Sequence, residues 1–126
     1  MRPEASAFLQ RSRISRQNGG HVRRRLAGRG GGPAYLAALH AAQAVIVDRT
    51  GRVIRRHRGV RNELWRLLKG DPRFDAELRG FLGRAYNLKS IADYETGPDA
   101  RVEVELARAT IETARRYVEV VAGLLA

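Results

Sequence analysis

The sequence predicts an all-α protein, an antiparallel up-and-down bundle of four to five helices. Three observations carry this prediction. Apolar residues recur every three or four positions after residue 33, as on the buried face of a helix. Glycine and proline stand at the ends of these periodic segments. The chain has 126 residues, 44% of them hydrophobic and none of them cysteine, which suits one domain that needs no disulfide or thiolate metal site.

An Arg/Gly-rich N-terminal segment, residues 1–32, precedes the bundle of residues 33–126. Within it, residues 10–32 combine glycine pairs and arginines with almost no apolar periodicity. We expect this segment to be poorly ordered, or to be a degenerate first helix. A local shift of reading frame in a GC-rich gene is one hypothesis for its composition.

Residues 34–49 form the first predicted helix of the bundle. Pro33 suits its first turn and Gly51 its end. Its apolar seam contains Tyr35, Leu39, Ala42 and Ile46. The many alanines of this segment let other helices approach closely, so we expect it to lie in the middle of the bundle.

Two further helices are predicted before the last one. The first runs from about Val60 to Lys69, with Leu64 and Leu67 on its apolar face and Gly70 as its stop. Asp71-Pro72 then restarts the chain, and the periodicity continues to Glu95. The apolar residues of this second helix are Phe74, Leu78, Phe81, Ala85, Leu88 and Ala92.

The last predicted helix follows a turn at residues 96–99 and shows the most regular pattern in the chain. Its apolar positions alternate spacings of three and four, as in a seam that packs on neighbouring helices. They are Val104, Ala107, Ile111, Ala114, Val118, Val121 and Leu125. Charged residues fall on the opposite arc, which favours a helix over a strand.

The positive charge is concentrated in two segments. The formal net charge is +11, and residues 1–32 carry +7 while residues 49–66 carry +6. Because 22 of the 24 bases are arginine, GC-rich codon usage alone can explain many of them, and a solvated surface stays an alternative to phosphate binding for each. No apolar stretch approaches the roughly 18 residues of a membrane span, so we expect a soluble, cytoplasmic protein with no membrane partner.

The basic stretch of residues 49–62 is the main candidate for chemistry. Six arginines surround His57, and such a loop could bind phosphates and use the imidazole for proton transfer at neutral pH. Alternatively, His57 and Asn62 cap helix ends while the arginines face water. None of His21, His40 and His57 has a His, Asp or Glu three or four residues away on a helix, the spacing at which two side chains can share a metal ion. We therefore predict no metal site and no cofactor.

Three blocks of residues resemble one known family. They are the Tyr- and Ala-rich run of residues 34–44, the turn His57-Arg-Gly-Val60, and residues 85–94, which end in Ala-Asp-Tyr. In this order and spacing they resemble the HEPN domains (higher eukaryotes and prokaryotes nucleotide-binding). They are most similar to the bacterial and archaeal branch associated with nucleotidyltransferase toxin–antitoxin pairs. Residues 1–9 also fit the family's N-terminal helix.

The resemblance implies a helical bundle, a homodimer and a nucleotidyltransferase partner. Many HEPN members are metal-independent RNases whose motif is an arginine, four to six intervening residues and then a histidine. Arg16 to His21 and Arg52 to His57 have this spacing, which so many arginines also produce by chance. Val53 follows Arg52 where the family's RNases favour a polar residue, and enzyme activity is therefore left open.

Six residues match the family's two polar blocks and are expected to converge at one end of the bundle. The arginines and Lys89 would contact phosphate, His57 would transfer or orient a proton, and the acidic and tyrosine residues would contact partner or nucleotide. These six are His57, Arg58, Arg61, Lys89, Asp93 and Tyr94.

The sequence is compatible with three functions. The first is a HEPN component of a toxin–antitoxin or defence module that binds a partner protein and RNA or nucleotide. The second is a metal-independent RNase in which His57 is catalytic. The third is a non-enzymatic nucleic-acid-binding protein, whose affinity should fall steeply with salt.

Overall fold

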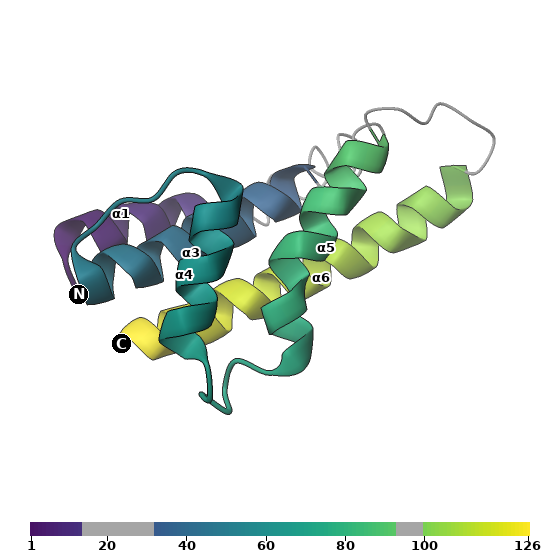
Figure 1. Ribbon diagram of the computed structural model, residues 1–126. Helices are drawn as coiled ribbons and strands as arrows, with labels where there is room; N and C mark the ends of the chain where they lie inside the picture. The colour runs from purple at the N-terminus through teal and green to yellow at the C-terminus, as the bar shows by residue number, and fades with distance from the viewer. Residues whose placement is uncertain (14–31, 93–99) are drawn as a thin grey trace.

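The computed structural model describes residues 1–13, 32–92 and 100–126. Within these residues all regular structure is helical, which confirms the predicted all-α class (Figure 1). The helices are α1 (Pro3–Ser12), α3 (Gly32–Thr50), α4 (His57–Leu68), α5 (Ala76–Ala92) and α6 (Ala100–Leu125). None of the helices in the described ranges is long and apolar enough to cross a membrane.

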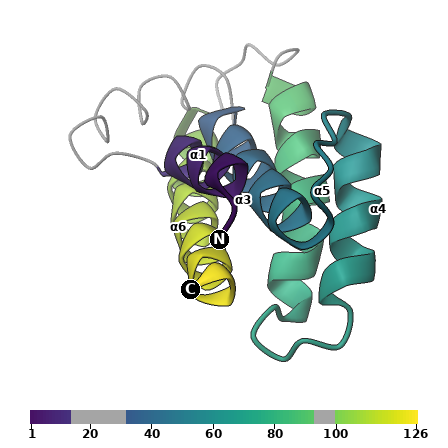
Figure 2. The ribbon, with the colours of Figure 1, turned by 90° about the vertical axis from the view of Figure 1, so that its left-hand side faces the viewer.

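Helix α3 is the centre of the molecule. It contacts α1, α4, α5 and α6, and Figure 2 shows it between the α1 and α6 side and the α4 and α5 side. Residues 41–47 are buried without a break, and all of them except Gln43 are apolar, as expected for a helix that is covered on every side. The prediction of a central, alanine-rich helix is thus confirmed.

Helices α1, α4, α5 and α6 surround α3. Helices α1 and α3 lie side by side and antiparallel, while α4 and α5 form a second antiparallel pair that crosses α3 steeply (Figures 1 and 2). Helix α6 packs on α3 and α5 and runs in the same general direction as α3 (Figure 1). This arrangement brings the first turn of α4 back over the first half of α3.

Helix α1 is part of the same core. Ala5, Phe8 and Leu9 are buried against the bundle, and the Phe8 ring stacks on His40 with 6.4 Å between ring centroids. The backbone N–H of Arg2 donates to Asp48 Oδ1 at 3.0 Å. The expectation for residues 10–32 falls mostly on residues 14–31, which lie outside the described part of the chain.

The predicted seam of the last helix is confirmed where the structure describes it. Six of the predicted seam positions of α6 are buried, while Glu105, Arg108, Glu112 and Glu119 are exposed on the opposite arc. The buried positions are Ala107, Ile111, Ala114, Val118, Val121 and Leu125.

Two helix starts differ from the prediction. Helix α4 begins at His57 and not at Val60; the three residues before Val60 are His, Arg and Gly, so apolar periodicity cannot reveal them. Helix α5 begins at Ala76, because the Asp75 carboxylate accepts a hydrogen bond from the Leu78 N–H at 3.0 Å and caps the helix there. The predicted stops hold, since Gly51 and Gly70 have φ values of 74° and 87°.

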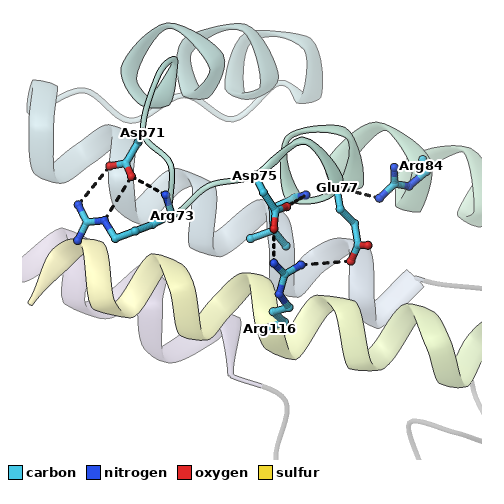
Figure 3. Close-up of polar contacts among 7 residues, drawn as sticks. Asp71, Arg73, Asp75, Glu77, Arg84 and Arg116 are labelled. Atoms are coloured by element: carbon cyan, nitrogen blue, oxygen red, sulfur yellow. Dashed lines mark hydrogen bonds and ion pairs between the residues drawn. The ribbon is translucent and has the colours of Figure 1, made fainter.

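An ion-pair network joins the start of α5 to α6 (Figure 3). Arg116 pairs with Asp75 and, at 3.2 Å, with Glu77, whose backbone carbonyl accepts from Arg84 at 2.8 Å. The N–H of Leu78 and the guanidinium of Arg116 hold the pKa of Asp75 below its usual range. Such exposed pairs contribute little to stability, but they leave these carboxylates already engaged with arginine.

Candidate functional site

The candidate site begins in the loop between α3 and α4, which α3 holds in place. The side-chain N–H of the buried Gln43 donates to the Ile54 carbonyl at 2.9 Å. A Cβ at Gly59 would lie 2.9 Å from Ile54 Cγ2, so only glycine lets the first turn of α4 lie this close to the loop. The loop and the N-terminus of α4 are thereby fixed on α3.

His57 lies in a cluster of three rings that come from three helices. Its Nδ1 is 2.9 Å from the hydroxyl oxygen of Tyr35 in α3. Its ring stacks on Tyr86 of α5, with centroids 4.1 Å apart and an angle of 16° between the planes. The centroids of Tyr35 and Tyr86 lie 5.5 Å apart. The imidazole is therefore oriented by one hydrogen bond and one stacking contact.

The surroundings of His57 favour its neutral form. Partial burial, and then the positive charge of Arg61, lower the pKa of His57 from its ordinary value of 6.5. Burial, and then the nearby Tyr86, raise the pKa of Tyr35 from 10.0. At neutral pH His57 is thus mostly uncharged and Tyr35 keeps its proton.

Two tautomers of neutral His57 suit two chemical roles. If Nδ1 carries the proton it donates to the Tyr35 oxygen, and Nε2 has the lone pair of a general base. If Nε2 carries the proton, the Tyr35 hydroxyl donates to Nδ1, and Nε2–H is a hydrogen-bond donor. The same contact can therefore support proton abstraction or ligand binding.

The arginines beside this cluster have no acidic partner in the described ranges. Arg58 and Arg61 are exposed, and neither takes part in an ion pair between described residues. A Cβ on Gly83 would lie 3.6 Å from the guanidinium carbon of Arg61, so this side chain lies against α5. These charges are available to an anion.

Two pockets flank the first turns of α4. One lies over the loop and is lined by Val53, Ile54, Arg55, Arg56, Arg58, Gly59 and Asn62. The other lies between α4 and α5 and is lined by Arg61, Asn62, Leu64, Trp65, Leu68, Phe74, Arg79, Gly80 and Leu82. Each has a volume of about 600 Å³. Asn62 lines both, so the two pockets are neighbours.

The structure brings together three of the six predicted site residues. His57, Arg58 and Arg61 share the first turns of α4. Lys89 lies near the C-terminal end of α5, the helix that carries Tyr86, but its side chain lies outside the described part. Asp93 and Tyr94 also lie outside the described residues, so their convergence with His57 stays a prediction.

Other members of the site were not identified from the sequence. Tyr35 was assigned to a helix seam, whereas it also bonds His57 from 22 positions away. Tyr86 and Trp65 are large aromatic residues that are 40% and 48% exposed. For Tyr86 and Trp65 the available signal was an aromatic residue outside the apolar seam of its helix. Among the described residues, no group of three or more His, Asp or Glu side chains is placed to hold a metal ion.

A comparison with protein-family models supplies an independent result. The model described as HEPN domain matches residues 4–124, which includes nearly all of α1 and of α6. No curated protein and no solved structure matches the chain.

Proposed function

The chain belongs to the HEPN domain family, and from that membership we propose that it binds RNA or a nucleotide as part of a toxin–antitoxin or defence module. Membership supports a role of the nucleic-acid-related or toxin–antitoxin type. The binding surface is the loop of residues 51–56 together with the first turns of α4. Arg58 and Arg61 contact phosphate there.

The observation that carries this proposal is a set of unpaired arginines next to an oriented imidazole. The four acids at Glu63, Asp71, Asp75 and Glu77 are each paired with an arginine. Arg58 and Arg61 are not paired within the described ranges. Phosphate neutralises such charges and releases counterions, which drives binding.

We also propose that the protein is a cytoplasmic homodimer and that it associates with a nucleotidyltransferase, as the resemblance to that HEPN branch implies. Lys89, Asp93 and Tyr94 belong to this proposal as contacts to partner or nucleotide. Light scattering of the purified chain tests the dimer. Copurification with a nucleotidyltransferase encoded beside it tests the partner, and failure of the two proteins to associate contradicts it.

The geometry of His57 favours a second function, a metal-independent RNase. When the Nδ1–H of His57 donates a hydrogen bond to the Tyr35 oxygen, Nε2 is free to remove the proton of an RNA 2′-hydroxyl. That oxygen then attacks the adjacent phosphorus. The bond between phosphorus and the 5′-oxygen of the next nucleotide breaks, this oxygen takes up a proton from water, and a 2′,3′-cyclic phosphate forms. Arg61 stabilises the charge on the phosphorane oxygens.

One experiment separates binding from cleavage. Purified protein is incubated with total cellular RNA in EDTA, and cleavage and retention are read on gels. We expect the Arg58→Ala/Arg61→Ala variant to lose RNA retention, while an Arg108→Ala/Arg115→Ala control on α6 keeps it.

The His57→Ala variant decides the second function. Cleavage by the native protein but not by His57→Ala supports the RNase, and no cleavage by either contradicts it. If the native protein retains no RNA, or if the two arginine variants behave alike, the RNA-binding proposal is wrong.

A further inference from the structure

The exposed Trp65 is the most unusual apolar residue on the α4 surface. Its side chain is 48% exposed, although the buried residues Leu64 and Leu68 of the same helix face the core. Arg79 of α5 places its guanidinium carbon 5.3 Å from the centroid of the indole. This cation–π contact holds the ring at the mouth of the groove between α4 and α5.

Trp65 and Arg79 line one pocket, which has an apolar floor. Leu64, Phe74 and Leu82 lie below them, and the volume is about 600 Å³. Ligand pockets commonly have this size. Indole and guanidinium groups are both flat and both stack on nucleobases. Arg79 has no ion pair within the described ranges, so the pocket also favours an anion.

The pocket is connected to the site around His57. Arg61 lines it and is close enough to His57 for its charge to act on the imidazole. Asn62 lines both this pocket and the basic pocket over the loop. A ligand in one pocket can therefore continue into the other without leaving the arginine-rich surface.

Building on the RNA-binding proposal, we infer that Trp65 and Arg79 form a base-stacking platform and that the ligand is a single-stranded RNA segment longer than one nucleotide. One base stacks at Trp65, and the backbone passes Asn62 so that phosphates meet Arg61 and Arg58. A duplex keeps its bases stacked on one another and is excluded. A second copy of this chain is disfavoured because two basic surfaces repel.

The single tryptophan of the chain gives a direct test, since all indole fluorescence comes from the platform. The full-length protein is titrated with a short oligouridylate, with uridine monophosphate, with an RNA duplex and with polyphosphate. We expect the single-stranded RNA to quench Trp65 at concentrations at least tenfold below those needed for the mononucleotide or the duplex. Polyphosphate has the charge without the bases and should bind with little quenching. Equal quenching by polyphosphate and RNA overturns the stacking inference.

Variants separate this inference from the proposed function. Trp65→Ala should weaken binding of labelled oligouridylate about tenfold, and Trp65→Phe should restore most of it. Leu106→Ala, at a residue of similar exposure on α6 (45%), should change the affinity less than about twofold.

Affinity that is unchanged in Trp65→Ala but lost in Arg58→Ala/Arg61→Ala overturns the platform and leaves the RNA-binding proposal standing. The groove would then be open to an acidic protein segment instead. If the native protein binds no RNA, both are wrong. Thermal melting of each variant identifies any loss of affinity that comes from unfolding.

Discussion

At the scale of single residues, the environment of His57 sets the charge of its imidazole at neutral pH. A histidine that is oriented by Tyr35 and stacked on Tyr86 is held in one position. Because burial and Arg61 lower the pKa of His57, the neutral ring is the form from which the proposed proton transfer and ligand binding would begin.

We predict that Arg61→Gln raises the pKa of His57 toward its ordinary value, because the variant removes the second of the two causes. The pKa can be followed by NMR titration of the imidazole carbon-bound protons. In the native protein the lowered pKa penalises folding when His57 is protonated, so its contribution to stability is complete above about pH 6.5 and is lost as the pH falls through the folded-state pKa. A His57 pKa that is the same in both proteins would contradict the role given to Arg61.

Loss of the hydroxyl should change the free energy of unfolding in opposite directions at two buried tyrosines, Tyr117 and Tyr35. The Tyr117 hydroxyl is buried between helices without a hydrogen-bond partner among the described residues, and its ring packs on Phe74 and Phe81. Tyr117→Phe should therefore raise the free energy of unfolding by about 1 kcal/mol. Tyr35→Phe removes a bonded hydroxyl and should lower it by about 1 kcal/mol. Urea unfolding of both variants measures the difference, and destabilisation by Tyr117→Phe would reveal a partner for that hydroxyl.

At the scale of helices, the ends are set by residues that periodicity does not report. The Asp75 cap moves the start of α5 beyond Phe74, and Phe74 stays buried although it precedes the helix. Gly70 ends the α4 region with a positive φ. Apolar spacing predicts which face of a helix is buried, whereas capping and glycine geometry determine where the helix stops.

Two glycines allow the effect of backbone conformation on stability to be separated from the effect of the room available for a Cβ atom. A Cβ on Gly70 or on Gly123 meets nothing within 4 Å, but only Gly70 has a positive φ, of 87°. Gly70→Ala should destabilise the protein by about 1 kcal/mol through backbone strain. Gly123→Ala, in the last turn of α6, should stabilise it by about 0.5 kcal/mol through helix propensity. Thermal denaturation of both variants is the check, and equal effects would show that the conformation at Gly70 is not required.

At the scale of the whole molecule, charge is separated from the core and placed unevenly along the surface. The bundle buries its apolar faces around α3, and the arginines of the loop and α4 lie on one side of that core. The start of α5 carries acids that are already paired with arginine (Figure 3). The net charge of +11 therefore matters less than which arginines lack an acid.

The salt dependence of RNA affinity tests whether the unpaired arginines matter more than the net charge. RNA affinity should fall steeply with salt, and the slope of log affinity against log salt should decrease by about 1.4 in Arg58→Ala/Arg61→Ala, at about 0.7 for each phosphate contact with single-stranded RNA. The Arg108→Ala/Arg115→Ala control should keep the native slope. A slope that falls equally in both variants would mean that RNA affinity depends only on the net charge of the protein.

The sequence by itself determined the helical class, the central place of the alanine-rich helix and the buried seam of the last one. Each follows from spacing and side-chain size within a single segment, and these local properties survive in any packing of the helices. That His57, Arg58 and Arg61 lie together was also predictable, because they are close in sequence. Only the tertiary structure decided that Tyr35 and Tyr86 meet His57, and that Arg79 covers Trp65. These contacts join different helices, and their geometry depends on crossing angles and close approaches, such as that at Gly59, which no local pattern encodes.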